Sequence, residues 1–258
     1  MATKKKKKRS IVGAPLTPEM LDKLGALKTL STAYAAPSDQ WTDTYRIWAC
    51  HGYRESGNEH VGFLKIQRAP SKSESVFVLH VTQEINNDEG IVHVLDTSIQ
   101  CQADSLATPI KWRMKSEFHD SKGKIVRDLG TEHIGRVHGN TIEIKTLGKT
   151  RRMPTSGPFT GEWCLLEAVQ RMPYTEADSI SMDVLKEMDL LLENHRIVYK
   201  GQDTVTIGGA TMVLHHFQQW GRGMLPYDYW LDQHHRLQMF VTLSIAYIRD
   251  ETAGQAKD

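Results

Sequence analysis

The chain has 258 residues, near the upper size of a single all-β sandwich or barrel, so one main domain is expected. Its 32 Lys and Arg against 31 Asp and Glu leave a formal charge of +1, which gives no overall preference for nucleic acid, anionic membranes or acidic substrates. Cys50, Cys101 and Cys164 lie far apart and outside any CxxC spacing. They therefore define neither a zinc site nor a disulfide framework, and buried thiols are expected.

Residues 1–16 are predicted to form a disordered basic tail. Lys4–Arg9 is an unbroken run of like charges with no apolar residue to offset the entropy of ordering. A solubilising tail is favoured, with an import-like signal or a patch for phosphate-rich surfaces as alternatives. Only Ile11 and Val12 follow before Gly13, too few for the apolar core of a secretory signal. A cytoplasmic location is the default expectation.

A helix is predicted over residues 17–34. Thr17–Glu19 combines a capping hydroxyl, a proline at the first helical position and an acid in the first turn. An apolar stripe follows at helical spacing, formed by Leu21, Leu24, Leu27 and Leu30. We interpret this segment as an accessory helix that docks on the main body, with a partner-binding helix as the alternative.

From Thr42 the apolar period changes to two, which predicts one β-rich domain over residues 42–249 and a flexible tail over 250–258. In the clearest strand, Ile110, Trp112, Met114 and Phe118 occupy one face, and charged residues occupy the other. Short turn-forming links between the strands favour antiparallel pairing. Strands are predicted at residues 43–51, 60–68, 75–84, 91–101, 109–119, 124–128, 132–138, 141–147, 195–200, 203–207, 210–219, 226–232 and 237–248.

One short helix interrupts the strands. Thr160–Gln170 follows a loop, is apolar over more than half of its circumference and is ended by Pro173, so it should be buried against the sheet. Residues 181–192 fit a helix and a strand equally well. A sheet with this many strands cannot stay flat, because its twist accumulates. The predicted fold is mainly β, a strongly curved antiparallel sheet or half-closed barrel with one or two helices packed against it.

The C-terminal hairpins carry a family resemblance. Gly208–Thr211, the strand that contains Phe217, and Tyr229–Asp232 with the turn to Leu237 resemble the closing hairpins of bacterial LolA/LppX-like envelope proteins and related families of unknown function. The resemblance implies a cleft for a lipid or other apolar ligand between sheet and helix, a location in the cell envelope, and no catalytic residues. This chain departs from the pattern by having no export signal and by placing His235 where the turn often has glycine.

The seam beside the short helix is the predicted ligand site, and an arginine at its mouth would suit an anionic headgroup. Its predicted lining consists of Trp112, Arg152, Trp163, Leu166, Met172 and Tyr229.

No metal site and no cofactor are expected. The pairs His215-His216 and His234-His235 are adjacent, so on a strand their side chains point to opposite faces. No metal-binding spacing, nucleotide-binding loop or Gly-x-Ser-x-Gly nucleophile turn is present.

These patterns favour a non-enzymatic module that binds an apolar or amphipathic, lipid-like ligand. The alternatives are a hydrolase-type enzyme with a His, Asp and Glu site carried on strands, and a structural or protein-interaction domain without a cavity. No run reaches the roughly 18 apolar residues of a membrane-spanning helix, so a soluble protein is expected. The patterns specify neither an oligomeric state nor a nucleic-acid partner.

Overall fold

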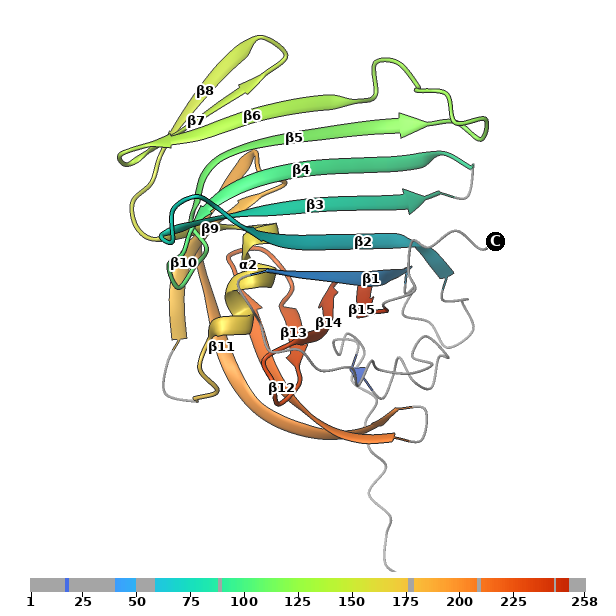
Figure 1. Ribbon diagram of the computed structural model, residues 1–258, viewed down its shortest axis with the longest axis vertical. Helices are drawn as coiled ribbons and strands as arrows, with labels where there is room; N and C mark the ends of the chain where they lie inside the picture. Colours follow the sequence, from blue (N-terminus) through green and yellow to red (C-terminus); the bar gives the residue numbers. More distant parts are fainter. Residues whose placement is uncertain are drawn as a thin grey trace, which may run out of the picture.

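A computed structural model describes residues 17–18, 40–49, 59–87, 90–175, 179–207, 210–243 and 245–250. Within these residues, fifteen strands form one sheet around a short helix (Figure 1). The strands are β1 (Trp41–Ala49), β2 (Glu59–Pro70), β3 (Val76–Asn86), β4 (Val92–Gln102), β5 (Pro109–His119), β6 (Thr131–His138), β7 (Thr141–Thr146), β8 (Lys149–Pro154), β9 (Phe159–Gly161), β10 (Ser179–Lys186), β11 (Leu190–Ile207), β12 (Ala210–Trp220), β13 (Tyr227–Leu231), β14 (Leu237–Thr242) and β15 (Ile245–Arg249). The helix α2 (Glu162–Ala168) continues into the 3-10 turn η1 (Val169–Arg171).

The sheet order is β8-β7-β6-β5-β4-β3-β2-β1-β15-β14-β13-β12-β11-β10-β9. Neighbours pair antiparallel except for β9 and β10, which pair parallel. The two edge strands, β8 and β9, are consecutive along the chain, so the sheet must bend back on itself. In Figure 1 one half lies above α2 and the other half curves beneath it. The predicted fold class, a strongly curved antiparallel sheet with a packed helix, is confirmed.

The period-two pattern is clear in β5. Trp112 and Met114 are each 3% exposed, whereas Lys111, Arg113 and Lys115 face solvent. Ile110 and Phe118, predicted on the same buried face, are half-buried. Phe118 lies near the end of β5, where its ring stacks on His93 with centroids 4.5 Å apart.

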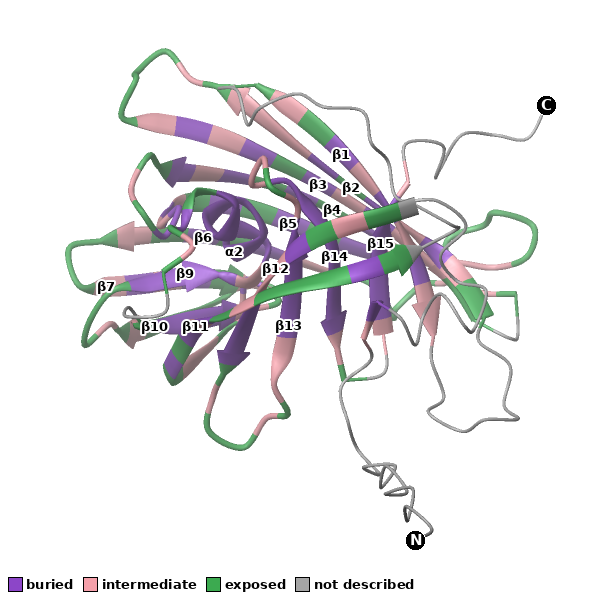
Figure 2. Cartoon of the chain, turned by 90° about the horizontal axis from the view of Figure 1, so that it is seen from below, coloured by how far each residue is buried: buried purple, intermediate pink, exposed green. Residues whose placement is uncertain are grey.

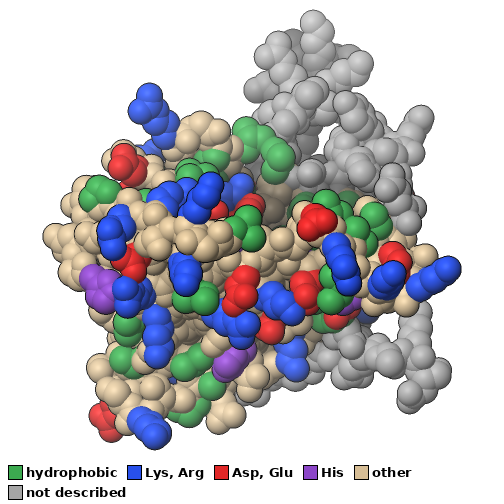
Figure 3. Space-filling view, turned by 90° about the horizontal axis from the view of Figure 1, so that it is seen from above, with side chains coloured by type: hydrophobic (Ala, Val, Ile, Leu, Met, Phe, Trp, Pro, Cys, Tyr) green, Lys and Arg blue, Asp and Glu red, His purple; other side chains and the backbone are tan. Residues whose placement is uncertain are grey.

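The main core fills the concave side of the sheet. Figure 2 shows buried residues concentrated on α2 and the strands around it, while the β11–β12 hairpin is exposed toward its tip. The outer surface seen in Figure 3 mixes basic and acidic side chains. Exposed ion pairs on the strands include Arg113 with Glu132 and Arg136 with Glu143. Such pairs favour solubility and add little to stability.

The helix predicted at residues 160–170 is present as α2 and η1. It begins at Glu162 because Phe159–Gly161 pairs with β10 as a short strand. Polar contacts fasten it at both ends: the Thr160 hydroxyl donates to the Leu106 carbonyl oxygen at 2.6 Å, and the buried Glu167 carboxylate pairs with Arg171. Since seven residues make a marginal helix in isolation, this packing supplies most of its stability.

Residues 181–192 form strand, turn and strand. β10 ends at Lys186, Glu187 and Met188 turn the chain with positive φ, and β11 begins at Leu190. The helical spacing of apolar residues is overridden because β10 is hydrogen-bonded on both sides, to β9 and β11.

Other predicted strands were wrong in their limits. The segment 237–248 is a hairpin of β14 and β15, and Leu243 at its turn has φ of 49°. The predicted strands at 195–200 and 203–207 are one long strand, β11, with a bulge after Tyr199. Residues 124–128 contain only one isolated bridge, from Ile125. β8 was missed because Lys149–Arg152 is polar and exposed, as suits an edge strand.

The turn between β13 and β14 shows how His235 can occupy a position where related turns often have glycine. This residue adopts φ of 63°, and its amide donates to the Asp232 carbonyl oxygen at 3.0 Å. Its ring stacks on Tyr174 with centroids 4.0 Å apart, and Tyr174 in turn stacks on His215 at 3.6 Å. Stacking offsets the cost of a left-handed conformation that glycine adopts freely.

The predicted basic tail, and the accessory helix beyond Thr17 and Pro18, lie outside the described residues. The C-terminal tail does too, apart from Asp250.

Candidate functional site

A cavity of about 510 Å³ lies between the start of α2 and the concave face of the sheet. This volume is typical of pockets that hold small molecules. Its walls come from α2, from β3 to β6 on one side and from β10 to β15 on the other, so both halves of the curved sheet contribute. Apolar side chains include Ile85, Leu95, Met114, Trp163, Leu166, Val184, Phe240 and Ile245.

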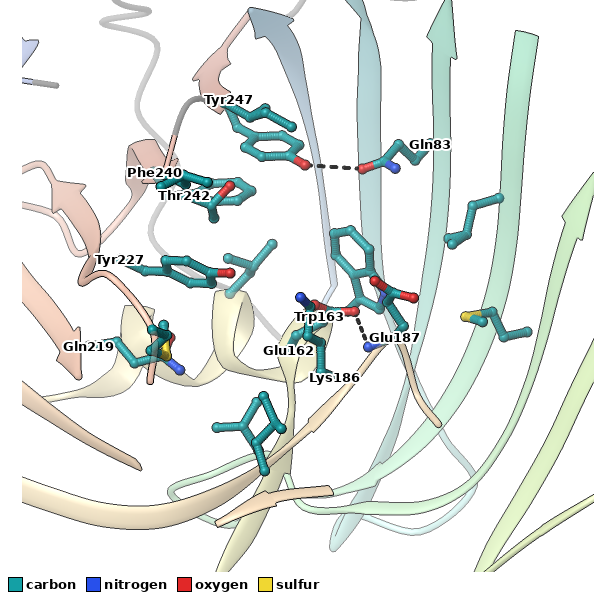
Figure 4. Close-up of a pocket in the computed structure, with 18 of the residues that line it drawn as sticks. Gln83, Glu162, Trp163, Lys186, Glu187, Gln219, Tyr227, Phe240, Thr242 and Tyr247 are labelled. Carbon is teal, nitrogen blue, oxygen red and sulfur yellow. Dashed lines mark hydrogen bonds between the residues drawn. The ribbon is translucent and has the colours of Figure 1, made fainter. Parts of the chain in front are cut away.

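One side of the cavity is an aromatic wall, formed by Tyr229, Phe240 and Tyr247 on β13, β14 and β15. These residues are register partners, so their side chains share one face of the sheet. Phe240 and Tyr247 stack with centroids 4.1 Å apart and planes 5° apart, and Tyr229 lies 6.2 Å from Phe240. Figure 4 shows Phe240 and Tyr247 with Tyr227 on one side of the pocket, and Trp163, Glu162 and Glu187 grouped on the other.

Two acidic residues, Glu162 and Glu187, line the cavity across from the aromatic wall. Glu162 opens α2 and lines the cavity, and its Oε1 accepts a hydrogen bond from the backbone N–H of Glu187. Burial raises the pKa of Glu162 to about 7, because a charged carboxylate is costly where little water reaches it. Glu187 adds to this rise, while its N–H and the nearby Lys186 oppose it. Near neutral pH this carboxyl therefore exists both protonated and ionised.

A short hydrogen-bond chain runs along another part of the lining. The Tyr229 hydroxyl donates to Gln219 Oε1 at 2.6 Å, and Gln219 Nε2 lies 2.9 Å from His195 Nδ1. Since an amide nitrogen only donates, His195 Nδ1 is the acceptor and the ring proton resides on Nε2. Burial lowers the pKa of His195 and keeps the ring neutral.

The other histidines of the cavity are held singly. His93 Nε2 lies 2.8 Å from the Ser116 hydroxyl, and His133 Nδ1 lies 2.6 Å from the Thr146 hydroxyl. Within the described part of the chain, no group of three or more His, Cys, Asp or Glu side chains is arranged to hold a metal ion. The adjacent pair at 215 and 216 diverges as predicted, with His215 hydrogen-bonded to Tyr199 and His216 to Asp228.

Three of the residues predicted to line the site, Trp163, Leu166 and Tyr229, do line this cavity. The other three lie elsewhere. Trp112 is buried in the core and donates its indole N–H to the Met188 carbonyl oxygen at 2.9 Å. Met172 is 3% exposed and packs in the main core beyond η1.

Arg152 is not among the residues that line this cavity. It sits on edge strand β8 with a side chain 72% exposed, and its Nε lies 2.9 Å from Glu143 Oε2. The neighbouring Arg151 pairs with Asp189. Both guanidinium groups therefore have carboxylate partners, and neither arginine is among the residues that line this cavity.

Sequence reasoning missed Glu162, Gln219 and the pairing of Phe240 with Tyr247. A continuous strand from 237 to 248 would place Phe240 and Tyr247 on opposite faces, since their numbers differ by seven. The hairpin reverses the chain and brings them opposite each other. A turn signal at Leu243 was the missing information.

Comparisons with known proteins support the fold. No family profile matches the chain, and no curated protein matches it. Among solved structures, it is similar to a β-barrel-like protein of a domain of unknown function, DUF1849, from Brucella abortus. The TM-score is 0.53 at 11% sequence identity, over 84% of this chain and 97% of that one. At this identity the likeness shows a shared β-barrel-like fold. No described helix is long and apolar enough to cross a membrane.

Proposed function

We propose that this protein binds an apolar or amphipathic small molecule, lipid-like in character, in the cavity between α2 and the curved sheet. The observation that carries the proposal is the cavity itself: about 510 Å³, with mainly aliphatic and aromatic walls between which polar and charged side chains are set. Apolar surface in such a cavity gains free energy when a ligand displaces water from it, and a few polar groups orient the ligand.

The arrangement of the lining favours this function over the two alternatives. A purely structural domain would fill its interior with side chains, since protein cores are close-packed. The histidines that line the cavity are each hydrogen-bonded to Gln219, Ser116 or Thr146, and a carboxylate, that of Asp189, lies 4.0 Å from the Nδ1 of His133. The resemblance to LolA/LppX-like carriers is a further reason to propose a lipid-like ligand.

The test is to fill the cavity from two of its sides. Leu166→Trp places an indole in the space from the helix side, and Thr242→Trp does so from β14, where the residue is only half-buried. The matched control is Leu129→Trp, at a residue 53% exposed outside the cavity. Binding of the neutral dye Nile red would be titrated by fluorescence, and co-purified ligand would be sought by native mass spectrometry.

We expect both cavity variants to weaken dye binding about tenfold or more while the control binds like the wild type. Thermal unfolding of each variant checks that the fold is kept. Equal binding by wild type and both filled variants would overturn the proposal. So would the absence of both dye binding and co-purified ligand in the wild type.

A further inference from the structure

We propose that the cavity selects an amphipathic ligand whose polar end is an organic cation, such as an alkylammonium group, and that the Glu162 carboxyl is its anchor. This inference rests on the proposed function and adds the chemistry of the ligand. It is carried by the charges that line the cavity, the hydrogen bonding of Glu162 and the aromatic wall opposite.

The charged groups in the lining are unbalanced. Of the Asp, Glu, Lys and Arg residues that line the cavity, two are acids, Glu162 and Glu187, and one is a base, Lys186. Burial lowers the pKa of His93 and of His195, so neither adds positive charge near neutral pH, and the third histidine of the lining, His133, lies 4.0 Å from the carboxylate of Asp189. A ligand cation would complete the charge balance, whereas an anionic headgroup would meet an excess of carboxylate.

Glu162 has bonding capacity to spare. Its Oε1 takes the N–H of Glu187, and across the described residues no other donor is hydrogen-bonded to this carboxyl. The groups that face it are Glu187 and Lys186 from the β10–β11 turn and the phenols of Tyr227, Tyr229 and Tyr247. Since burial raises the pKa of Tyr229 and of Tyr247, these two phenols stay neutral. Lys186 is thus the only cation among these neighbours.

The aromatic wall also attracts cations. Rings of Tyr, Trp and Phe draw cations through their quadrupole, more strongly where water is excluded. Trp163 stands beside Glu162 at the start of α2, and Tyr227 and the aromatic wall lie across the cavity (Figure 4). An alkylammonium group between them would contact a carboxylate on one side and aromatic rings on the other, with its chain along Leu166 and Val184.

Binding of a cation should be linked to the ionisation of Glu162. The cation favours the carboxylate over the carboxylic acid, so its binding releases a proton wherever the free protein is protonated. With a pKa of about 7 in the free protein, the affinity should rise from pH 6 to pH 8 by about tenfold and level off above that.

The experiment compares three amphiphiles with the same eight-carbon chain: trimethyloctylammonium, octyl glucoside and octyl sulfate. Each displaces Nile red from the full-length protein at pH 6 and pH 8. The variants are Glu162→Gln, which keeps an oxygen acceptor for the Glu187 N–H, and Glu193→Gln, a control at an exposed carboxylate on β11.

We expect the cation to bind at least tenfold more tightly than the sulfate at pH 8. Glu162→Gln should abolish both this preference and its pH dependence while Nile red still binds, and Glu193→Gln should change neither. Equal or tighter binding of the glucoside or the sulfate, or an unaltered preference in Glu162→Gln, would overturn the inference and leave the proposed function standing. If Nile red and all three amphiphiles fail to bind, both are overturned.

Discussion

At the scale of single residues, Glu162 is costly to bury as a carboxylate, and it is also the proposed anchor for a ligand. A carboxyl at the edge of an apolar cavity keeps its proton more tightly than one in water, and burial raises its pKa to about 7. A neutral residue at such a position would avoid the cost of burying an ionisable carboxyl. Carboxyls of this kind are therefore found mainly where they serve binding or chemistry.

This penalty predicts the pH dependence of stability. The folded pKa of Glu162, about 7, is above its ordinary value of 4.5, so the folded state holds the proton that the unfolded chain loses. The free energy of unfolding therefore falls as pH rises from about 4.5 to 7, by about 1–3 kcal/mol in total. Glu162→Gln should remove this part of the decline.

The check is urea denaturation of wild type and Glu162→Gln at pH 4.5, 6 and 8. The variant should gain stability relative to wild type as pH rises, with most of the change complete by pH 8. Parallel curves for the two proteins would contradict the raised pKa.

At the scale of elements, two thiols are in contact where α2 packs on the sheet. Cys101 on β4 and Cys164 on α2 are both fully buried, with their sulfur atoms 3.7 Å apart. Burial raises the pKa of Cys101 well above its ordinary value, and the contact with Cys164 adds to the rise. The expectation of buried thiols is confirmed for these two; Cys50 lies outside the described residues.

These thiols should be protected as long as the helix stays docked. In a Cys50→Ser background, iodoacetamide at pH 8 should label neither Cys101 nor Cys164 in native buffer, because the thiolate is the reactive form and neither sulfur is accessible. Both should react in guanidinium chloride. Peptide mass spectrometry over time gives the labelling at each position. Rapid native labelling of Cys164 would instead identify it as a reactive nucleophile.

At the scale of the whole molecule, side-chain contacts join the two ends of the curved sheet. Its edge strands β8 and β9 are not paired with each other in the described part of the chain. The β10–β11 turn reaches the inner face of the other half, where Trp112 donates to the Met188 carbonyl oxygen and Arg151 pairs with Asp189. Thr108 donates to the Phe159 carbonyl oxygen at 3.2 Å nearby. These contacts join the two halves of the sheet that line the cavity, so the proposed binding and the stability of the fold should depend on each other.

Gly135 tests this closure. A Cβ at this position would lie 2.0 Å from ring carbons of Trp112, whose buried indole has little room to move. We expect Gly135→Ala to cost about 1–3 kcal/mol in the free energy of unfolding and to weaken Nile red binding, because the displaced indole disturbs its bond to Met188. The matched control is Gly157→Ala, where a Cβ meets nothing within 4 Å.

Urea midpoints of the two variants provide the measurement. Gly157→Ala should unfold within about 0.5 kcal/mol of wild type. Gly135→Ala with an unchanged midpoint would show that the indole is free to shift and that the closure is loose.

The sequence by itself determined the mainly β fold, most strand positions and the buried short helix. These features are local: a pleated strand places alternate residues on opposite faces, so Trp112 and Met114 could be assigned to the core from spacing alone. The same holds for Leu166 and Trp163, since a two-turn apolar helix must bury its side chains somewhere. Tyr229 was also expected at the site, and it lines the cavity.

Only the tertiary structure decided which residues meet across the cavity. One positive φ near Leu243 makes a hairpin of a predicted single strand and thereby brings Phe240 beside Tyr247. Glu162 meets the N–H of Glu187 because strand pairing turns residues 181–192 back on themselves. Arg152 lies on edge strand β8 and pairs with Glu143 on β7 instead of lining the cavity. Each of these contacts depends on pairing between segments that are distant in the sequence. The free energy of such pairing is set by the distant partner, so local sequence patterns do not predict it.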